Sequence, residues 1–180
     1  MLVRYLFAAI LWGVWLLPFV LRGLKGTETA VVKDRSARWG LLIETIGIGI
    51  AWGVPQSEVS GWRVAAAIVL ALAANLQGWS AVRHLGRQFR VDAGLNADHE
   101  LVRSGAYAVV RHPIYASMFA MLMVTGLLIA QWGAFLCAAV VYIIGTEIRV
   151  RSEERLLRGR FGAAFDDYAT RVSAYIPFVR

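Results

Sequence analysis

The sequence predicts an all-α integral membrane protein with about five transmembrane helices and a cytoplasmic C-terminal helical segment. Hydrophobic residues make up 58% of its 180 residues, whereas charged residues make up only 17%. Soluble domains typically carry about 25% charged residues, so this composition favours a chain that is largely surrounded by lipid. The charged residues gather in short segments between long apolar runs, as expected of a chain that crosses a membrane several times.

The N-terminal half predicts three membrane helices, over residues 2–24, 39–54 and 62–82. In the first, Arg4 followed by an apolar run resembles a signal peptide, but no small-residue cleavage motif comes after the run, so we expect a retained helix. The second carries a series of small residues that allow close helix packing in lipid: Gly47, Gly49, Ala51 and Gly53. We expect its Glu44 to be an interfacial carboxylate that faces water or a lipid headgroup.

The C-terminal half predicts a helical hairpin and a charged extension. A fourth span over 114–130 and a fifth over 134–148 are separated by a tight turn at 131–133. The helical pattern continues to about residue 174 while the density of charge rises, so the fifth helix is predicted to leave the membrane. Gly162 is expected to end it, and a short helix over 163–171 follows.

The basic residues predict the orientation. The connection over 22–38 and the end of the third helix are basic, whereas the turns at 55–61 and 131–133 contain no Lys or Arg. Because basic loops stay in the cytoplasm, we expect the N-terminus outside, the C-terminus inside and the polar segments on the cytoplasmic side. The net charge of +7 is spread over these segments, which favours the lipid bilayer as partner and argues against nucleic acid.

Two polar groups are candidates for a site. Arg111 and His112 directly precede Pro113, which suits the first turn of a helix, where free backbone N–H groups can bind an anion. Arg149 and Glu153 lie four residues apart, so they share a helix face and are expected to form an ion pair, with Glu154 beside them. Each group alone is also typical of an interfacial anchor or a solvated helix. The hairpin, however, brings the two groups together at one membrane surface.

The same residues carry a resemblance. The pattern His99-x-Leu101-Val102-x-x-Gly105-x-Tyr107-x-x-x-Arg111-His112-Pro113-x-Tyr115, then Arg149-x-x-x-Glu153-Glu154-x-x-Leu157 and Phe161-Gly162-x-x-Phe165-x-x-Tyr168, resembles the isoprenylcysteine carboxyl methyltransferase family. Related phospholipid methyltransferases share the later part. The resemblance covers about residues 83–178, and Phe165 stands where a tyrosine is usual.

The resemblance implies a membrane enzyme that uses S-adenosylmethionine without a Rossmann domain. It implies that Arg149 and Glu153 are catalytic, with Arg149 at the carboxylate of a lipophilic, prenylcysteine-like acceptor or another small-molecule acceptor. The implied cofactor-binding residues are His99, Glu100, Leu101, Val102, Tyr107, Arg111, His112, Pro113, Ile114, Tyr115, Glu153 and Glu154. Since the three histidines are dispersed, we expect no metal site.

The resemblance also implies a division of the chain. Residues 1–82 would form a three-helix membrane anchor, and residues 83–180 a methyltransferase core. Within the core, a cofactor segment over 83–115 is followed by the hairpin at 114–148 and by C-terminal helices over 149–180.

Two other functions fit parts of the pattern. Membrane reductases of the sterol-reductase type share an Arg-His-x-x-Tyr segment and use NADPH, but Glu153-Glu154 with Leu157 favours the methyl donor. A non-catalytic membrane scaffold or small transporter is the second alternative. Few charges within the spans, and no pair of broken helices in matching halves, count against transport.

Overall fold

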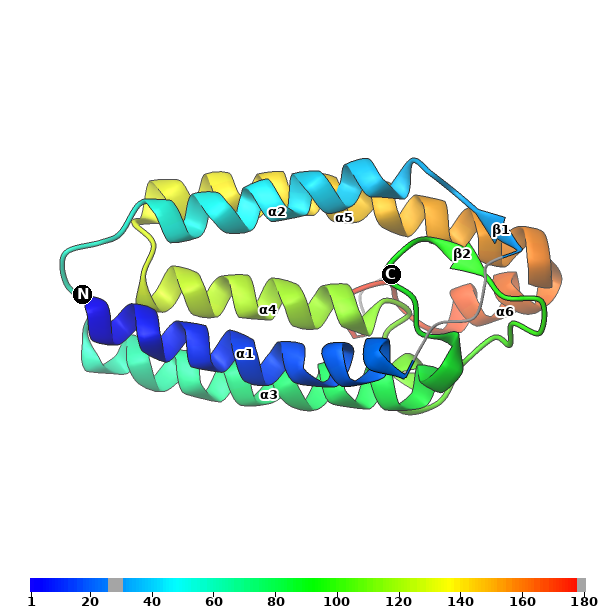
Figure 1. The fold of residues 1–180 in the computed structure, drawn as a ribbon, viewed down its shortest axis with the longest axis horizontal. Helices are drawn as coiled ribbons and strands as arrows, with labels where there is room; N and C mark the ends of the chain where they lie inside the picture. The colour runs from blue at the N-terminus through cyan, green and yellow to red at the C-terminus, as the bar shows by residue number, and fades with distance from the viewer. Residues whose placement is uncertain (26–30, 178–180) are drawn as a thin grey trace.

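A computed structural model of the protein, which describes residues 1–25 and 31–177, folds into an elongated bundle of antiparallel helices (Figure 1). Within these ranges five long helices run along the bundle: α1 (Leu2–Leu24), α2 (Ala37–Gly53), α3 (Gly61–Leu85), α4 (Pro113–Leu128) and α5 (Trp132–Phe161). The shorter α6 (Ala163–Arg171) folds back beside the end of α5 (Figure 1). The molecule is therefore mostly helical, as predicted.

The helices lie where the sequence predicts them. Their ends differ from the predicted ends by a few residues at most, and α5 runs without a break from the predicted membrane span into the charged extension. Gly162 ends α5 with a φ of 50°, a conformation that favours glycine. By length and composition α1, α3 and α5 can each cross a membrane, so the chain is an integral membrane protein.

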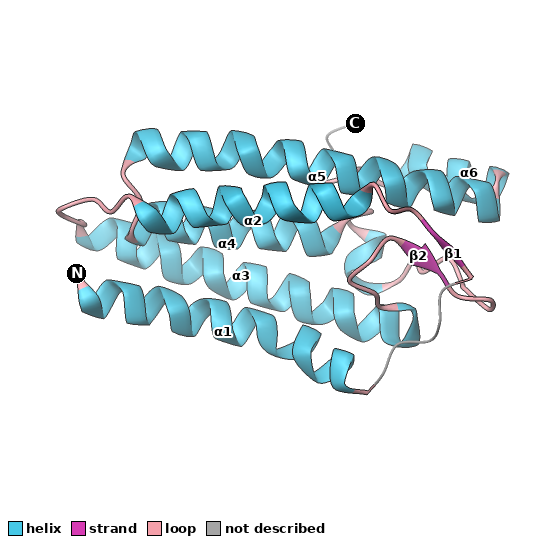
Figure 2. Cartoon of the chain, turned by 45° about the horizontal axis from the view of Figure 1, so that its top comes forward, coloured by secondary structure: helices cyan, strands magenta, loops and turns pink. Residues whose placement is uncertain are grey.

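The helices pack as two groups, with α2 along α5 and with α1 and α4 along α3 (Figure 2). Two tryptophans fix α1 to α4, since Trp12 Nε1 donates to Thr125 Oγ1 at 2.9 Å and Trp15 Nε1 donates to Ser117 Oγ at 3.2 Å. Both indole rings are buried, and these bonds satisfy their N–H groups away from water.

Close contact between α2 and α5 depends on glycines. A Cβ atom at Gly47 would lie 2.9 Å from the Ala138 carbonyl oxygen, and one at Gly145 would lie 2.6 Å from the Gly40 carbonyl oxygen. The predicted role of the small residues of α2 is therefore confirmed for Gly47, but among the described residues Gly49 has no neighbour within 4 Å of such an atom. The backbones of α2 and α5 touch along one face only.

One end of the bundle is polar and carries the shorter elements. The strands β1 (Val32–Lys33) and β2 (Gly94–Leu95) form an antiparallel ribbon with Val32 opposite Leu95. Short 3₁₀ helices over Gly86–Gln88 and Gly105–Ala108 and the helix α6 lie at the same end (Figure 1). The sequence did not predict the ribbon, because two-residue strands leave no alternating pattern. The ribbon holds the segment after α3 across the end of the bundle. Residues 26–30 of the predicted basic connection, and residues 178–180, lie outside the described residues.

Candidate active site

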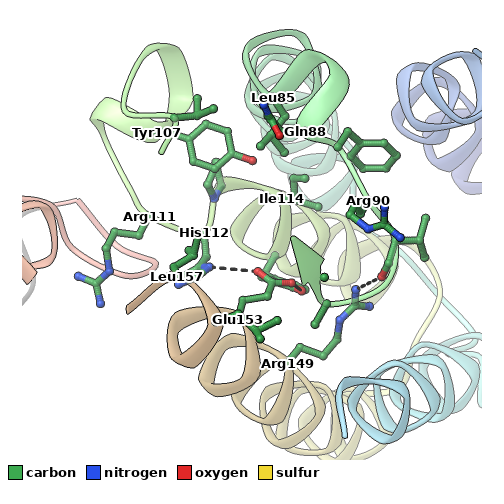
Figure 3. Close-up of a pocket in the computed structure, with 18 of the residues that line it drawn as sticks. Leu85, Gln88, Arg90, Tyr107, Arg111, His112, Ile114, Arg149, Glu153 and Leu157 are labelled. Atoms are coloured by element: carbon green, nitrogen blue, oxygen red, sulfur yellow. Dashed lines mark hydrogen bonds and ion pairs between the residues drawn. The ribbon is translucent and has the colours of Figure 1, made fainter. Parts of the chain in front are cut away.

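A cavity of about 300 Å³ lies at the polar end of the bundle, enclosed by the start of α4, the charged part of α5 and the segment after α3 (Figure 3). Every predicted site residue except Glu154 lines it: His99, Glu100, Leu101, Val102, Tyr107, Arg111, His112, Pro113, Ile114, Tyr115, Arg149 and Glu153. The two candidate groups of the sequence thus meet in one place. Pro113 is the first residue of α4, as predicted.

Glu154 lies behind the cavity wall instead of in it. Its Oε1 accepts hydrogen bonds from Arg111 Nε at 3.0 Å, from Arg111 Nη2 at 2.9 Å and from His112 Nε2 at 3.0 Å. Arg111 Nη1 donates further to the carbonyl oxygens of Ala169 and Val172, at 3.0 and 2.5 Å. The guanidinium of Arg111 therefore points away from the centre of the cavity (Figure 3) and joins the segment before α4 to α5, to α6 and to the residue after α6.

His112 is the N-cap residue of α4, and its ring is buried between two carboxylates. Its Nδ1 stands 3.7 Å from Glu153 Oε2, and its Nε2 bonds to Glu154. Burial alone would lower the pKa of His112, but the two glutamates outweigh it and raise that pKa above its ordinary value. The backbone N–H groups of Arg111 and His112 donate to the carbonyl oxygens of Ser173 and Ala174, at 2.8 and 3.0 Å.

Glu153 faces the cavity from α5 (Figure 3). The hydroxyl of Tyr115 donates to Glu153 Oε1, and Tyr142 in turn donates to the Tyr115 carbonyl oxygen at 3.0 Å. On the opposite wall the Tyr168 hydroxyl donates to the carbonyl oxygen of Tyr107 at 2.6 Å. These bonds fix the side chains of Tyr115, Tyr168 and Glu153 around the cavity.

Arg149 does not pair with Glu153, so the predicted ion pair is wrong. Its Nη1 lies 3.1 Å from Glu44 Oε2, its Nη2 donates to the Val91 carbonyl oxygen at 2.8 Å, and its guanidinium stands 5.1 Å from the centre of the Tyr115 ring. The prediction that Glu44 faces water or a headgroup is also wrong, since this residue is only 1% exposed. Close approach of α2 and α5 buries it beside Arg149, which neutralises its charge.

The segment between α3 and α4 supplies a further part of the wall. His99 is half-buried, and burial together with the charges of Arg90 and Arg160 holds its pKa below the ordinary value. The lowered pKa favours the neutral imidazole. Burial also raises the pKa of Tyr107 well above its ordinary value, which keeps the phenol protonated.

Sequence reasoning missed several wall residues. Gln88 to Leu95 line the cavity through the segment that the β ribbon holds, and Trp15, Leu16 and Phe19 of α1 line its apolar side. Only the alternation of apolar and charged residues from Phe89 to Asp92 indicated an extended segment there. For the α1 residues the sequence contains no signal, because they look like any other lipid-facing residues of a span.

The cavity suits a ligand that is both charged and partly apolar. It combines the Glu153 carboxylate and the Arg149 guanidinium with aromatic and aliphatic walls. Three buried polar atoms of its lining residues have no hydrogen-bond partner in the described part of the chain: Gln88 Oε1, His99 Nδ1 and Arg149 Nε. Since buried polar groups are normally paired, these atoms fit a binding site for a polar ligand.

Comparison with known proteins agrees with the motif. The model of the isoprenylcysteine carboxyl methyltransferase family matches residues 66–159. The protein-S-isoprenylcysteine O-methyltransferase of Schizosaccharomyces pombe is 32% identical over 102 residues, which cover 56% of this chain and 43% of that protein. Enzyme B of the same name from Arabidopsis thaliana is 34% identical over 82 residues, or 45% of this chain and 41% of that protein.

A third relative extends over more of the chain. The nickel-cobalt-cadmium resistance protein NccN of Alcaligenes xylosoxydans xylosoxydans is 24% identical over 155 residues, which cover 83% of this chain and 68% of that protein. The matches to the two methyltransferases, in contrast, span less than half the length of those proteins.

Proposed function

Because this chain belongs to the isoprenylcysteine carboxyl methyltransferase family, we propose that it transfers a methyl group from S-adenosylmethionine to a carboxylate of a lipophilic, prenylcysteine-like acceptor. One observation carries the proposal: Arg149 and Glu153 line the same cavity as His112 and Tyr115, at the polar end of a membrane helix bundle. This arrangement combines an anion-binding group, a cation-binding group and a lipid-facing scaffold.

In this proposal the chain crosses the membrane five times, with the N-terminus outside and the C-terminus and the cavity on the cytoplasmic side. The helices α2 and α4 contain 17 and 16 residues, so each spans about 25 Å at 1.5 Å per residue. The hydrocarbon core of a bilayer is about 30 Å thick, and flanking residues or local thinning of the bilayer make up for the shorter length of these helices. Residues 1–82 would act as the anchor and residues 83–180 as the methyltransferase core.

The residues of the cavity would hold the cofactor at its charged ends. Glu153 suits the ammonium group, and His112 with the first turn of α4 suits the carboxylate. The faces of Tyr107 and Tyr115 suit the adenine ring or the sulfonium. When bound, S-adenosylmethionine supplies a methyl group on a positively charged sulfur atom. The protein's own part is to orient the acceptor against it and to exclude water.

Arg149 would orient the acceptor carboxylate and would not act as a base, because arginine stays protonated. A carboxylate is already nucleophilic, so positioning and a dry cavity can supply most of the acceleration. The apolar side of the cavity supports a lipophilic acceptor. Leu16 of α1 and Leu41 of α2 line it, and they are 44% and 40% exposed.

The test uses purified protein, labelled S-adenosylmethionine and a panel of prenylcysteines, small thiols and lipids. We expect transfer to a prenylcysteine, and we expect Arg149→Ala and Glu153→Ala each to abolish it while the thermal unfolding transition is retained. Arg151→Ala is the matched control, since Arg151 lies on the same helix, is exposed and pairs with Glu147. Near-normal turnover in both site variants would rule out the assignment. A melting temperature raised by NADPH instead of S-adenosylmethionine would favour the reductase.

A further inference from the structure

We propose that Glu44 of α2 is the positioning residue of Arg149, so that the acceptor end of the site depends on a helix outside the residues that match the family model. The effect of Glu44 on methyl transfer rests on the proposed function, whereas its contact with Arg149 does not. Glu44 does not line the cavity, whereas Arg149 does (Figure 3). Glu44 can therefore reach a bound acceptor only through Arg149.

Both oxygens of Glu44 are engaged by α5. Oε2 lies 3.1 Å from Arg149 Nη1, and Oε1 accepts a hydrogen bond from Thr146 Oγ1 at 2.9 Å. The side chain is only 1% exposed. A carboxylate in a membrane helix is costly unless it is paired, and such residues usually serve a function. Here the partner is the residue proposed to contact the acceptor.

Arg149 is held on three sides. Glu44 binds one terminal nitrogen, the Val91 carbonyl oxygen accepts from the other at 2.8 Å, and the Tyr115 ring centre stands 5.1 Å from the guanidinium carbon. A free arginine side chain carries about 2 kcal/mol of rotamer entropy, which a binding event would otherwise have to overcome. Its Nε is buried and has no partner in the described chain, so it remains available as a donor.

The backbone geometry that brings the two groups together is specific to this place. A Cβ atom at Gly40 would lie 2.5 Å from Arg149 Cγ, and one at Gly145 would lie 2.7 Å from the Glu44 nitrogen. Two glycines on facing helices thus allow α2 to approach α5 beside the pair. A role in packing alone would need neither the carboxylate nor its second bond to Thr146.

The first experiment needs no catalytic activity. Phenylglyoxal modifies accessible arginines, and peptide mass spectrometry gives the rate for each one. Arg149 is 7% exposed, so it should react slowly, and Glu44→Gln should accelerate its modification roughly tenfold, since hydrogen bonds between charged groups are worth about that factor. The rate at Arg151 should not change. Ala51→Gly, which loosens the same buried face of α2 without touching Arg149, is the control for general destabilisation.

The second experiment separates positioning from packing. Glu44→Gln should lower kcat/KM for the acceptor by about 10- to 100-fold, as expected of a misplaced substrate-binding group, and should leave the Kd of S-adenosylmethionine within about twofold. Glu44→Asp keeps the charge and should be less impaired. Thr146→Val removes only the hydrogen bond from Thr146 to Glu44, so it should lower kcat/KM by a smaller factor than Glu44→Gln does. If Glu44→Gln fails to fold, Thr146→Val takes its place in this test.

An unchanged rate of Arg149 modification in Glu44→Gln would overturn the inference. So would an equal loss of cofactor and acceptor binding, which indicates a merely structural role. If the wild-type protein methylates no acceptor, the proposed function fails, while the phenylglyoxal rates still decide whether Glu44 positions Arg149.

Discussion

At the residue scale, Glu154 joins two cationic groups of the cavity wall through one oxygen. Arg111 and His112 both bond to its Oε1, and all three side chains are largely buried. Removing this carboxylate would take away the acceptor of Arg111 Nε, Arg111 Nη2 and His112 Nε2 in a region that water reaches poorly. Breaking a buried pair in this way costs more than the pair contributes, because the remaining charge is not compensated.

We therefore expect Glu154→Ala to lower the free energy of unfolding by roughly 3 kcal/mol and to weaken binding of S-adenosylmethionine. Thermal unfolding and isothermal titration calorimetry measure the two effects. Asp166→Ala breaks the exposed pair with Arg158 and is the matched control, for which a change below about 1 kcal/mol is expected. Equal effects of the two substitutions would contradict the buried role of Glu154.

The raised pKa of His112 predicts a pH dependence of stability. Because its pKa in the folded protein lies above the ordinary value of 6.5, its contribution to stability is fully present below about pH 6.5. It is lost as the pH rises through the folded-state pKa. The melting temperatures of the wild type and of His112→Gln, measured from pH 6 to pH 9, should therefore converge as the pH rises. A gap that stays constant or widens would mean that His112 is neutral in the folded protein.

At the scale of elements, the contact of α2 with α5 is the most extensive between the described helices, and two of its glycines provide a matched pair of tests. Gly47→Ala would place a methyl group 2.9 Å from backbone atoms of α5, so we expect a loss of roughly 2 kcal/mol in the free energy of unfolding. Gly49→Ala makes the same change on the free side of α2 and should leave stability unchanged or raise it by up to about 1 kcal/mol. Thermal unfolding of the two variants in the same detergent distinguishes them. Equal losses would contradict the close approach.

The elements themselves were predictable, because a membrane helix is marked by the length of its apolar run and by the charges that bound it. The start of α4 at Pro113 and the end of α5 at Gly162 follow from local chemistry and are confirmed. The pairing of Glu44 with Arg149 was not predictable in this way. It depends on which faces of α2 and α5 meet, and neither sequence segment specifies its partner. The prediction of an Arg149–Glu153 pair failed because only spacing within one helix was considered.

At the scale of the whole molecule, the resemblance to the family and the meeting of the two motifs are confirmed. The two motifs meet because a short turn joins α4 to α5, so that α5 runs back along α4 and passes the start of α4. Part of the remaining wall comes from the segment that ends in β2, just before His99, and part comes from α1, which is about 80 residues away in sequence from the first motif. Contacts of that range leave no periodic signal, so the cavity is only partly visible in the sequence.

The proposed orientation is tested by labelling in intact cells. In a Cys137→Ala background, which removes the single cysteine, Ser57→Cys and Thr170→Cys place exposed thiols at opposite ends of the bundle. A membrane-impermeant maleimide should label Ser57→Cys directly and Thr170→Cys only after permeabilisation. The reverse pattern would place the cavity outside the cytoplasm.

The bonds from Arg111 and His112 to Ser173 and Ala174 have a consequence for biosynthesis. The ribosome adds residues 173 and 174 only after all five long helices have been made, so the wall of the cavity cannot close while the helices are entering the membrane. A chain that stalls after α5 could be inserted and still lack a formed site. Completion of the site therefore reports that synthesis has passed residue 174, and quality control that senses an open cavity would detect products that stop before it.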